Sequence, residues 1–110
     1  MLILRLNSLQ CHNTETITGP DKAYIIVNGN IVWGPKKIND DQSKDLEGIS
    51  IEFSDNCKIE LYDDDSLPGD PDDHLGTAYV WARQVDQEQH ISFNGSSWSY
   101  TLHCCVKKKD

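Results

Sequence analysis

Residues 57–76 read CKIELYDDDSLPGDPDDHLG, an alternating segment followed by an acidic one. In the first part, Cys57, Ile59 and Leu61 share one phase of an apolar/polar alternation, which is typical of a β-strand that buries one face. In the second part, six aspartates fall within eleven residues, namely Asp63, Asp64, Asp65, Asp70, Asp72 and Asp73. This stretch therefore predicts a half-buried strand that leads into an acidic loop.

The acidic loop suggests a bound cation. Crowded carboxylates repel one another and raise each other's pKa, so a folded loop tolerates them best when a positive charge sits among them. No Lys or Arg occurs between Ile59 and Ala82. Oxygen donors without a set of Cys and His ligands suit calcium, which accepts about six to eight oxygens, better than a transition metal. The alternative is a solvated acidic loop that only keeps the protein soluble.

Alternation with a period of two recurs along the rest of the chain. The clearest segments are Ile49 to Phe53 and Trp98 to Val106. Further short strand candidates are Tyr24–Val27, Ile31–Trp33, Leu75–Trp81 and His90–Phe93, and the start, Met1 to Leu6, resembles a first strand. Turn sequences such as Asn28-Gly29 and Asn94-Gly95 separate them. About eight short strands with regular turns predict an all-β fold, an eight-stranded antiparallel β-sandwich, with a small barrel as the alternative.

No segment shows a sustained helical period with capping signals. The polar stretch Asp40 to Glu47 predicts at most one turn of helix, and residues 36–46 are expected to form an irregular loop. The 110 residues fit one domain. We place this domain at residues 1–106, followed by a basic tail at residues 107–110.

Strand phase predicts which acids converge. Asp63 continues the inward phase of Leu61, and Asp65 points the same way while the backbone stays extended. Asp73 brings the chain back to the same rim as the next strand begins. The side chain of Asp64 is expected to point outward. Three carboxylates on one hairpin would form part of a cation shell, and a neighbouring loop would have to complete it.

The segment Leu61 to Asp65, followed by Asp73-His74-Leu75-Gly76, resembles the third calcium-binding loop of C2 domains. In that loop one strand ends in D-x-D and the next begins after D-x-x-G. Upstream, the segment Gly19 to Val27 resembles the first calcium-binding loop of the same family. An EF-hand is excluded, because the sixth position counted from Asp63 is Pro68 instead of Gly. The resemblance covers nearly the whole chain and implies a C2-like β-sandwich.

The resemblance also implies a set of calcium ligands from two loops. They are Asp21, Asp63, Asp65 and Asp73, with Glu15 in the place of an early acid of the first loop. Asp70 and Asp72 lie on extra residues of the third loop and would replace a ligand or bind a second ion. The backbone carbonyl of Asp64 is a further donor. We therefore expect Ca²⁺ as the bound ion.

The expected function is that of a calcium-responsive binding or regulatory module with a protein partner. Calcium-dependent docking on anionic phospholipid is the alternative, with Ile17, Leu67 and Pro68 as apolar tips and Lys36 and Lys37 as a basic pair. A further alternative is a carbohydrate- or protein-binding sandwich with a merely solvated acidic loop, in which tryptophans would stack on sugars. The candidates for that role are Trp33, Trp81 and Trp98.

Catalysis is not expected. The four histidines, at positions 12, 74, 90 and 103, are scattered, and no Ser lies in a nucleophile-elbow sequence. His74 beside Asp73 is the only pair close enough to suggest acid–base chemistry. A loop histidine next to acids is more often a local counter-charge.

The net charge of −8 and the pI near 4.7 exclude nucleic acid as the expected partner. The start, Met1 to Leu6, has no basic region followed by a long apolar one, and we expect a cytoplasmic protein.

The four cysteines are expected to be buried and reduced, with a disulfide as the alternative. They are Cys11, Cys57, Cys104 and Cys105. A zinc site formed by Cys11, His12, His103 and Cys105 would require the two terminal strands to bring these four residues together.

Overall fold

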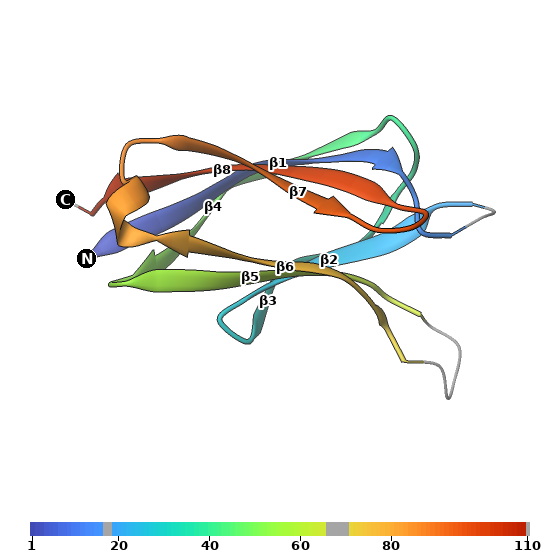
Figure 1. Cartoon of the computed structure of the whole chain (residues 1–110), viewed down its shortest axis with the longest axis horizontal. Coiled ribbons are helices and arrows are strands. Elements are labelled where there is room, and N and C mark those ends of the chain that lie inside the picture. The colour runs from blue at the N-terminus through green and yellow to red at the C-terminus, as the bar shows by residue number, and fades with distance from the viewer. Residues whose placement is uncertain (17–18, 66–70, 110) are drawn as a thin grey trace.

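The computed structural model describes residues 1–16, 19–65 and 71–109, which form a sandwich of two four-stranded antiparallel sheets (Figure 1). The strands are β1 (Leu2–Asn13), β2 (Asp21–Val27), β3 (Asn30–Ile38), β4 (Ser43–Phe53), β5 (Asn56–Asp63), β6 (Asp73–Trp81), β7 (Glu88–Asn94) and β8 (Ser99–Lys108). The eight-stranded antiparallel sandwich predicted from the sequence is therefore confirmed, and the barrel is excluded.

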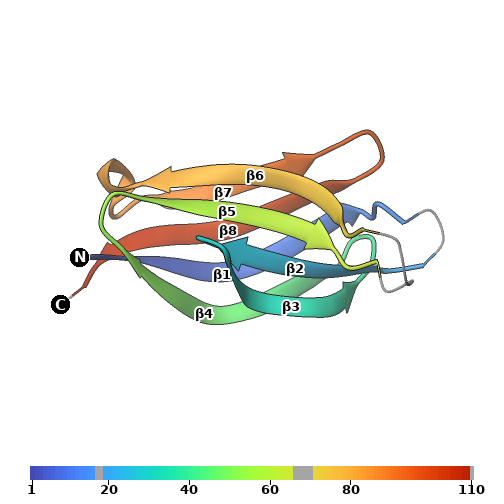
Figure 2. The same ribbon diagram turned by 90° about the horizontal axis from the view of Figure 1, so that it is seen from below.

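The strand order is β4-β1-β8-β7 in the first sheet and β3-β2-β5-β6 in the second. Figure 2 shows the second sheet from its outer side, with β5 between β2 and β6. A 3-10 turn, η1 (Ala82–Gln84), lies between β6 and β7, where the chain passes from one sheet to the other. Within residues 1–16, 19–65 and 71–109, no helix is long or apolar enough to cross a lipid bilayer.

The inward phases predicted for β5 and β8 form the core. Cys57, Ile59 and Leu61 are fully buried, as are Tyr100 and Leu102 on the facing sheet. Both sheets contribute to one cluster of buried side chains. Complete burial of a large aliphatic side chain stabilises the folded state by about 1.5–3 kcal/mol, so these alternating positions are the main source of stability.

The prediction of a helical turn at Asp40 to Glu47 and of an irregular loop at residues 36–46 was wrong. Strand β3 continues to Ile38 and β4 already begins at Ser43. Leu46 is buried and belongs to the core. Glu47 and Gly48 both have positive φ, and the pairing of β4 with β1 shifts register there. The irregularity breaks the period of two, which hid the first half of β4 in the sequence.

The basic segment expected to be a tail is largely part of a strand. In β8, Lys107 pairs with Ile3 and Lys108 pairs with Leu2. The backbone N–H of Lys109 then donates to the carbonyl of Met1. Residue 110 lies outside the described residues.

The acidic segments meet at one end of the sandwich. The ends of β1 and β5 and the starts of β2 and β6 lie together there, and the two termini lie at the opposite end (Figures 1 and 2). Asp63 at the end of β5 is the register partner of Asp73 at the start of β6. The backbone N–H of Asp64 donates to the carbonyl of Lys22 on β2, at 2.8 Å. We call this end the acidic rim.

Gly34 on β3 provides a test of the packing between β3 and β2. Its φ is +83°, and a Cβ at this position would lie 2.3 Å from the backbone oxygen of Ala23. We expect Gly34→Ala to lower the free energy of unfolding by about 2–4 kcal/mol, because strain and a backbone clash add together. Denaturant unfolding monitored by circular dichroism measures the change.

The matched control is Gly29→Ala. Gly29 has a similar φ of +86° but no atom within 4 Å of the added Cβ. This variant carries only the backbone strain, about 1–2 kcal/mol. Equal losses in the two variants would contradict the close contact at Gly34.

Candidate metal site

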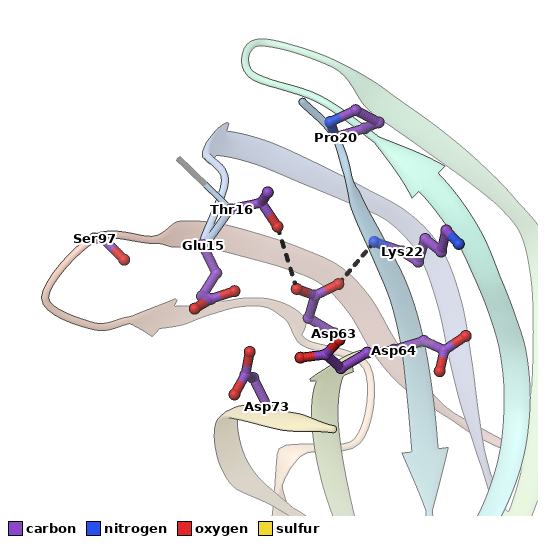
Figure 3. A pocket seen from close by; sticks show the side chains of 9 residues that line it. Glu15, Thr16, Pro20, Lys22, Asp63, Asp64, Asp73 and Ser97 are labelled. Atoms are coloured by element: carbon purple, nitrogen blue, oxygen red, sulfur yellow. Dashed lines mark hydrogen bonds between the residues drawn. The ribbon is translucent and has the colours of Figure 1, made fainter. Parts of the chain in front are cut away.

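A cavity of about 530 Å³ opens at the acidic rim (Figure 3). It is lined by Glu15, Thr16, Pro20, Lys22, Asp63, Asp64, Asp65, Asp73 and Ser97. These residues come from the segment between β1 and β2, the start of β2, the end of β5, the start of β6 and the connection between β7 and β8. Five of the nine are acids, so the cavity is rich in oxygen donors.

Three carboxylates from separate segments converge beside this cavity, and two of them, Glu15 and Asp63, line it. Single oxygens of Glu15, Asp21 and Asp63 lie within 4.8 Å of one another. Asp21 is fully buried and Asp63 is 6% exposed. Asp73 lies across from Asp63 on the neighbouring strand, and its side chain points into the same space as Glu15 (Figure 3). Hard oxygen donors in this density suit a calcium-type cation.

Asp21 holds the preceding segment in place. Its Oδ2 accepts hydrogen bonds from the N–H of Glu15 at 2.8 Å and from the hydroxyl of Tyr100. Its Oδ1 accepts a hydrogen bond from the N–H of Thr16 at 2.9 Å. A carboxylate has about four lone-pair sites, and three of them are used here. Asp21 therefore fixes where Glu15 and Thr16 lie and keeps at most one site for an ion.

Asp63 also accepts hydrogen bonds. Its Oδ1 accepts the N–H of Lys22 at 2.8 Å, and its Oδ2 accepts the hydroxyl of Thr16 at 3.5 Å (Figure 3). Burial raises the pKa of Asp63, and the nearby charge of Asp21 adds to the rise, whereas the hydrogen bond from Lys22 opposes it. A hydrogen bond with Glu15 also lowers the pKa of Asp63, so it adds a third partner to this carboxylate.

Glu15 carries the clearest electrostatic signal of the site. Its pKa rises from the ordinary 4.5 to about 7. Burial is the largest cause, followed by a hydrogen bond with Asp63 and the negative charge of Asp73. Charge is therefore costly at this carboxylate, because burial and the neighbouring acids Asp63 and Asp73 both disfavour it.

The remaining acids of the third loop differ in role. In Figure 3 the Asp64 side chain extends away from Glu15 and Asp73, as the strand phase predicts. Asp65 lines the cavity, and its backbone N–H donates to Oδ1 of Asp72 at 3.0 Å. Oδ2 of Asp72 accepts the Tyr24 hydroxyl at 2.5 Å, which lowers the pKa of Asp72. Asp72 thus ties β2 to the third loop, and Asp70 lies outside the described residues.

Among the predicted ligands, the structure gathers Glu15, Asp21, Asp63 and Asp73, and it places Asp65 on the wall of the same cavity. Their binding of an ion stays a prediction. Sequence reasoning missed Lys22, a cation on β2 that also lines the cavity, because Lys22 is far from the acidic loop in sequence and the pairing of β2 with β5 brings it there.

Tyr100 was missed as well. It lies in the alternating segment Trp98 to Val106, and the signal was that the hydroxyl of a buried tyrosine needs an acceptor.

The zinc hypothesis was wrong. Cys11 is the register partner of Tyr100, whereas Cys105 is the partner of Arg5, so the two thiols lie several residues apart along the paired strands. The Nε2 atom of His12 instead lies 3.0 Å from the hydroxyl of Thr101. All four cysteines are buried, as expected, and their reduced state stays a prediction.

The side chains weighed for other functions have local partners. The Nε2 atom of His74 lies 2.7 Å from the hydroxyl of Thr77. Trp33 is buried, and the indole N–H of Trp98 donates to the carbonyl of Leu75. Trp81 is the exposed one of the three tryptophans.

The buried bond between Tyr100 and Asp21 can be tested by Tyr100→Phe. Removal of the hydroxyl leaves one oxygen of a fully buried carboxylate with one donor fewer. We expect the free energy of unfolding to fall by about 1.5–3 kcal/mol, the usual contribution of a hydrogen bond to a charged group. Tyr79→Phe, at a residue that is 52% exposed, is the control and should change stability by less than about 0.5 kcal/mol. Equal stability of the two variants would contradict the role of the bond.

The raised pKa of Glu15 predicts a pH-dependent stability in the presence of a chelator. The folded state binds this proton more tightly than the unfolded chain, so the stabilisation is complete below about pH 4.5 and is lost as the pH rises through about 7. Asp63 acts in the same direction. We expect the melting temperature to fall between acidic and mildly alkaline buffer, and Glu15→Gln to reduce the slope. An unchanged slope in this variant would contradict the burial of the Glu15 carboxyl.

Comparison with known proteins finds likeness in structure but not in sequence. No protein-family model matches the sequence, and no curated protein matches it. One similar solved structure is described as that of a C2 domain, with a TM-score of 0.63 and 15% identity, covering 96% of this chain and 98% of that chain. A C2 domain of plant extended synaptotagmin 1 has a TM-score of 0.53 and 6% identity, covering 99% of this chain and 95% of that chain.

A third similar structure is human GIVD cytosolic phospholipase A2, with a TM-score of 0.60 and 14% identity. The match covers 99% of this chain and 16% of the phospholipase chain. At these identities the likeness concerns the fold. The architecture and the two C2 neighbours agree with the resemblance seen in the third-loop sequence, and the chain therefore has a C2-like fold.

Proposed function

We propose that this chain is a calcium-binding C2-like module whose ion is held at the acidic rim. The observation that carries the proposal is the convergence of Glu15, Asp21 and Asp63 within 4.8 Å. Glu15, Asp63 and Asp73 would supply the main carboxylate ligands, and Asp65 lines the same cavity. Asp21 would act mostly by fixing Glu15, since three of its lone-pair sites already accept hydrogen bonds from the protein.

A cation at this position would reduce the electrostatic repulsion between the acids of the acidic rim. Asp63 and Asp73 are direct cross-strand partners, and like charges in that arrangement destabilise a sheet. Burial adds to the cost of charging Glu15 and Asp63. A calcium ion would offset both the repulsion between Asp63 and Asp73 and the cost of charging the buried carboxylates. Binding would therefore stabilise the folded state. Calcium binding would change the charge and the order of the acidic rim. A protein partner could then bind the calcium-loaded form in preference to the calcium-free form.

Docking on anionic phospholipid is the second candidate function. It is favoured by the likeness to a C2 domain of extended synaptotagmin and to part of cytosolic phospholipase A2. The expected apolar tips, Ile17, Leu67 and Pro68, lie outside the described residues. Lys36 and Lys37 are exposed on β3, and the ammonium of Lys36 lies 5.9 Å from the centre of the Trp33 ring.

Calorimetric titration of calcium into chelator-treated protein tests the proposal, with magnesium as the ion control and a parallel melting curve. We expect saturable binding and a raised melting temperature. Asp63→Asn and Asp65→Asn should each weaken the affinity by about tenfold or more, because each removes a charged donor. Asp64→Asn is the matched control, since the Asp64 side chain extends away from Glu15 and Asp73.

Two outcomes would contradict the site. Absence of heat and of any melting shift at millimolar calcium would leave a C2-like fold without an ion. A loss of affinity that is largest in Asp64→Asn would place the ligands on the other phase of the β5 extension.

A further inference from the structure

A second charged site lies on the first sheet, toward the end that carries the termini. It is a cavity of about 220 Å³ lined by Ile3, Arg5, Ser50, Lys107 and Lys108. These residues come from the start of β1, the second half of β4 and the end of β8. The acidic rim lies at the opposite end of the sandwich (Figure 1). We call this cavity the basic pocket.

Strand pairing assembles the basic pocket from residues that are far apart in the sequence. Ile3 on β1 is the register partner of Lys107 on β8, and Arg5 is the partner of Ser50 on β4. Ile3 and Arg5 are two residues apart on one strand and therefore face the same side. A Cβ at Gly48 would lie 3.1 Å from Nε of Arg5, so the Arg5 side chain passes close over the Gly48 backbone.

The cations of the basic pocket, Arg5, Lys107 and Lys108, form none of the ion pairs found in the part of the chain that the structure describes. Among the described residues, the two ion pairs join Lys58 to Glu60 and Lys109 to Glu52. None of the carboxylates at residues 1–16, 19–65 and 71–109 lines the basic pocket, although Glu52 lies opposite Ile3 in the register. Three cations thus share a small cavity in a chain whose net charge is −8. Their mutual repulsion favours an anion at the point where they converge.

We propose that the basic pocket binds a phosphate group. The planar guanidinium of Arg5 can donate two parallel hydrogen bonds to phosphate oxygens, and Lys107 and Lys108 add two positive charges. The hydroxyl of Ser50 donates to the carbonyl of Gly48 at 2.9 Å and can turn to a phosphate oxygen as a fourth donor. A tetrahedral dianion matches this combination of charge and donors. The phosphate belongs either to a free phosphorylated compound or to a lipid headgroup.

The test uses the whole chain in a chelator, so that its result does not depend on calcium at the acidic rim. Inorganic phosphate is titrated at constant ionic strength, with chloride as the reference salt, while backbone amide signals are followed by NMR. We expect saturable shifts concentrated at residues 3–5, 48–50 and 105–108. The double variant Arg5→Gln/Lys107→Gln should lose about tenfold or more in affinity. The matched control is Lys58→Gln/Arg83→Gln, which removes one Lys and one Arg from exposed positions outside the basic pocket and should bind as the unaltered chain does.

A second arm distinguishes the source of the phosphate. Sedimentation with phosphatidylcholine vesicles, with and without phosphatidic acid, is compared for the same three proteins in the chelator. Binding to the acidic vesicles that the double variant loses would identify a lipid headgroup. Saturable phosphate shifts without vesicle binding would identify a free phosphorylated compound.

Shifts that do not saturate, or an equal loss in the two double variants, would overturn the site and leave only general counter-ion attraction. A protein that binds phosphate here but no calcium would keep this inference and refute the calcium proposal.

Discussion

The hydrogen bond from Tyr100 to Asp21 is the contact on which the acidic rim depends. It joins β8 of one sheet to β2 of the other, and both side chains are fully buried. The same carboxylate accepts the N–H groups of Glu15 and Thr16. A charge buried without such partners would cost several kcal/mol, so the two sheets and the preceding segment must form together for Asp21 to be accommodated. The position of Glu15 follows from this requirement.

Close to Asp21, the fold brings together other acids whose mutual repulsion destabilises the folded state. Asp63 and Asp73 face each other across β5 and β6, and Glu15 adds a third carboxylate to the same cavity. The protein offsets part of this cost with backbone donors, such as the N–H of Lys22. The remaining repulsion and the burial of these groups raise the pKa of Glu15 and of Asp63. Such repulsion lowers the free energy of unfolding, and perturbed pKa values of this kind are often found at functional sites.

The sequence predicted the fold where alternation was regular. The phase of Cys57, Ile59 and Leu61 gave the buried face of β5, and its continuation correctly separated Asp63 from Asp64. It failed at β4, because positive φ at Glu47 and Gly48 shifts the register and breaks the period. A local pattern predicts the phase of a regular strand well. It does not predict a register shift, because the shift depends on how the strand pairs with its neighbour.

Long-range pairing explains what else the sequence did not reveal. Lys22 lines the acidic cavity from β2, and Lys107 meets Ile3 and Arg5 only because β8 pairs with β1. In the sequence, Lys107 belongs to a terminal run of lysines and is far from Arg5, so a local pattern does not relate the two residues. The predicted acids Asp63, Asp65 and Asp73 belong to one hairpin, where neighbours in sequence are neighbours in space, so strand phase could group them.

The placement of the two charged cavities makes the molecule an electric dipole. Acids gather at one end of a body whose longest dimension is 44 Å, and an unpaired basic group lies toward the other end (Figure 1). Such a molecule turns in the field of a charged surface before it touches it, and this rotation raises the fraction of productive encounters. Neutralising the acids would shrink the dipole moment, so the ionic state of one end sets how the opposite end approaches a partner.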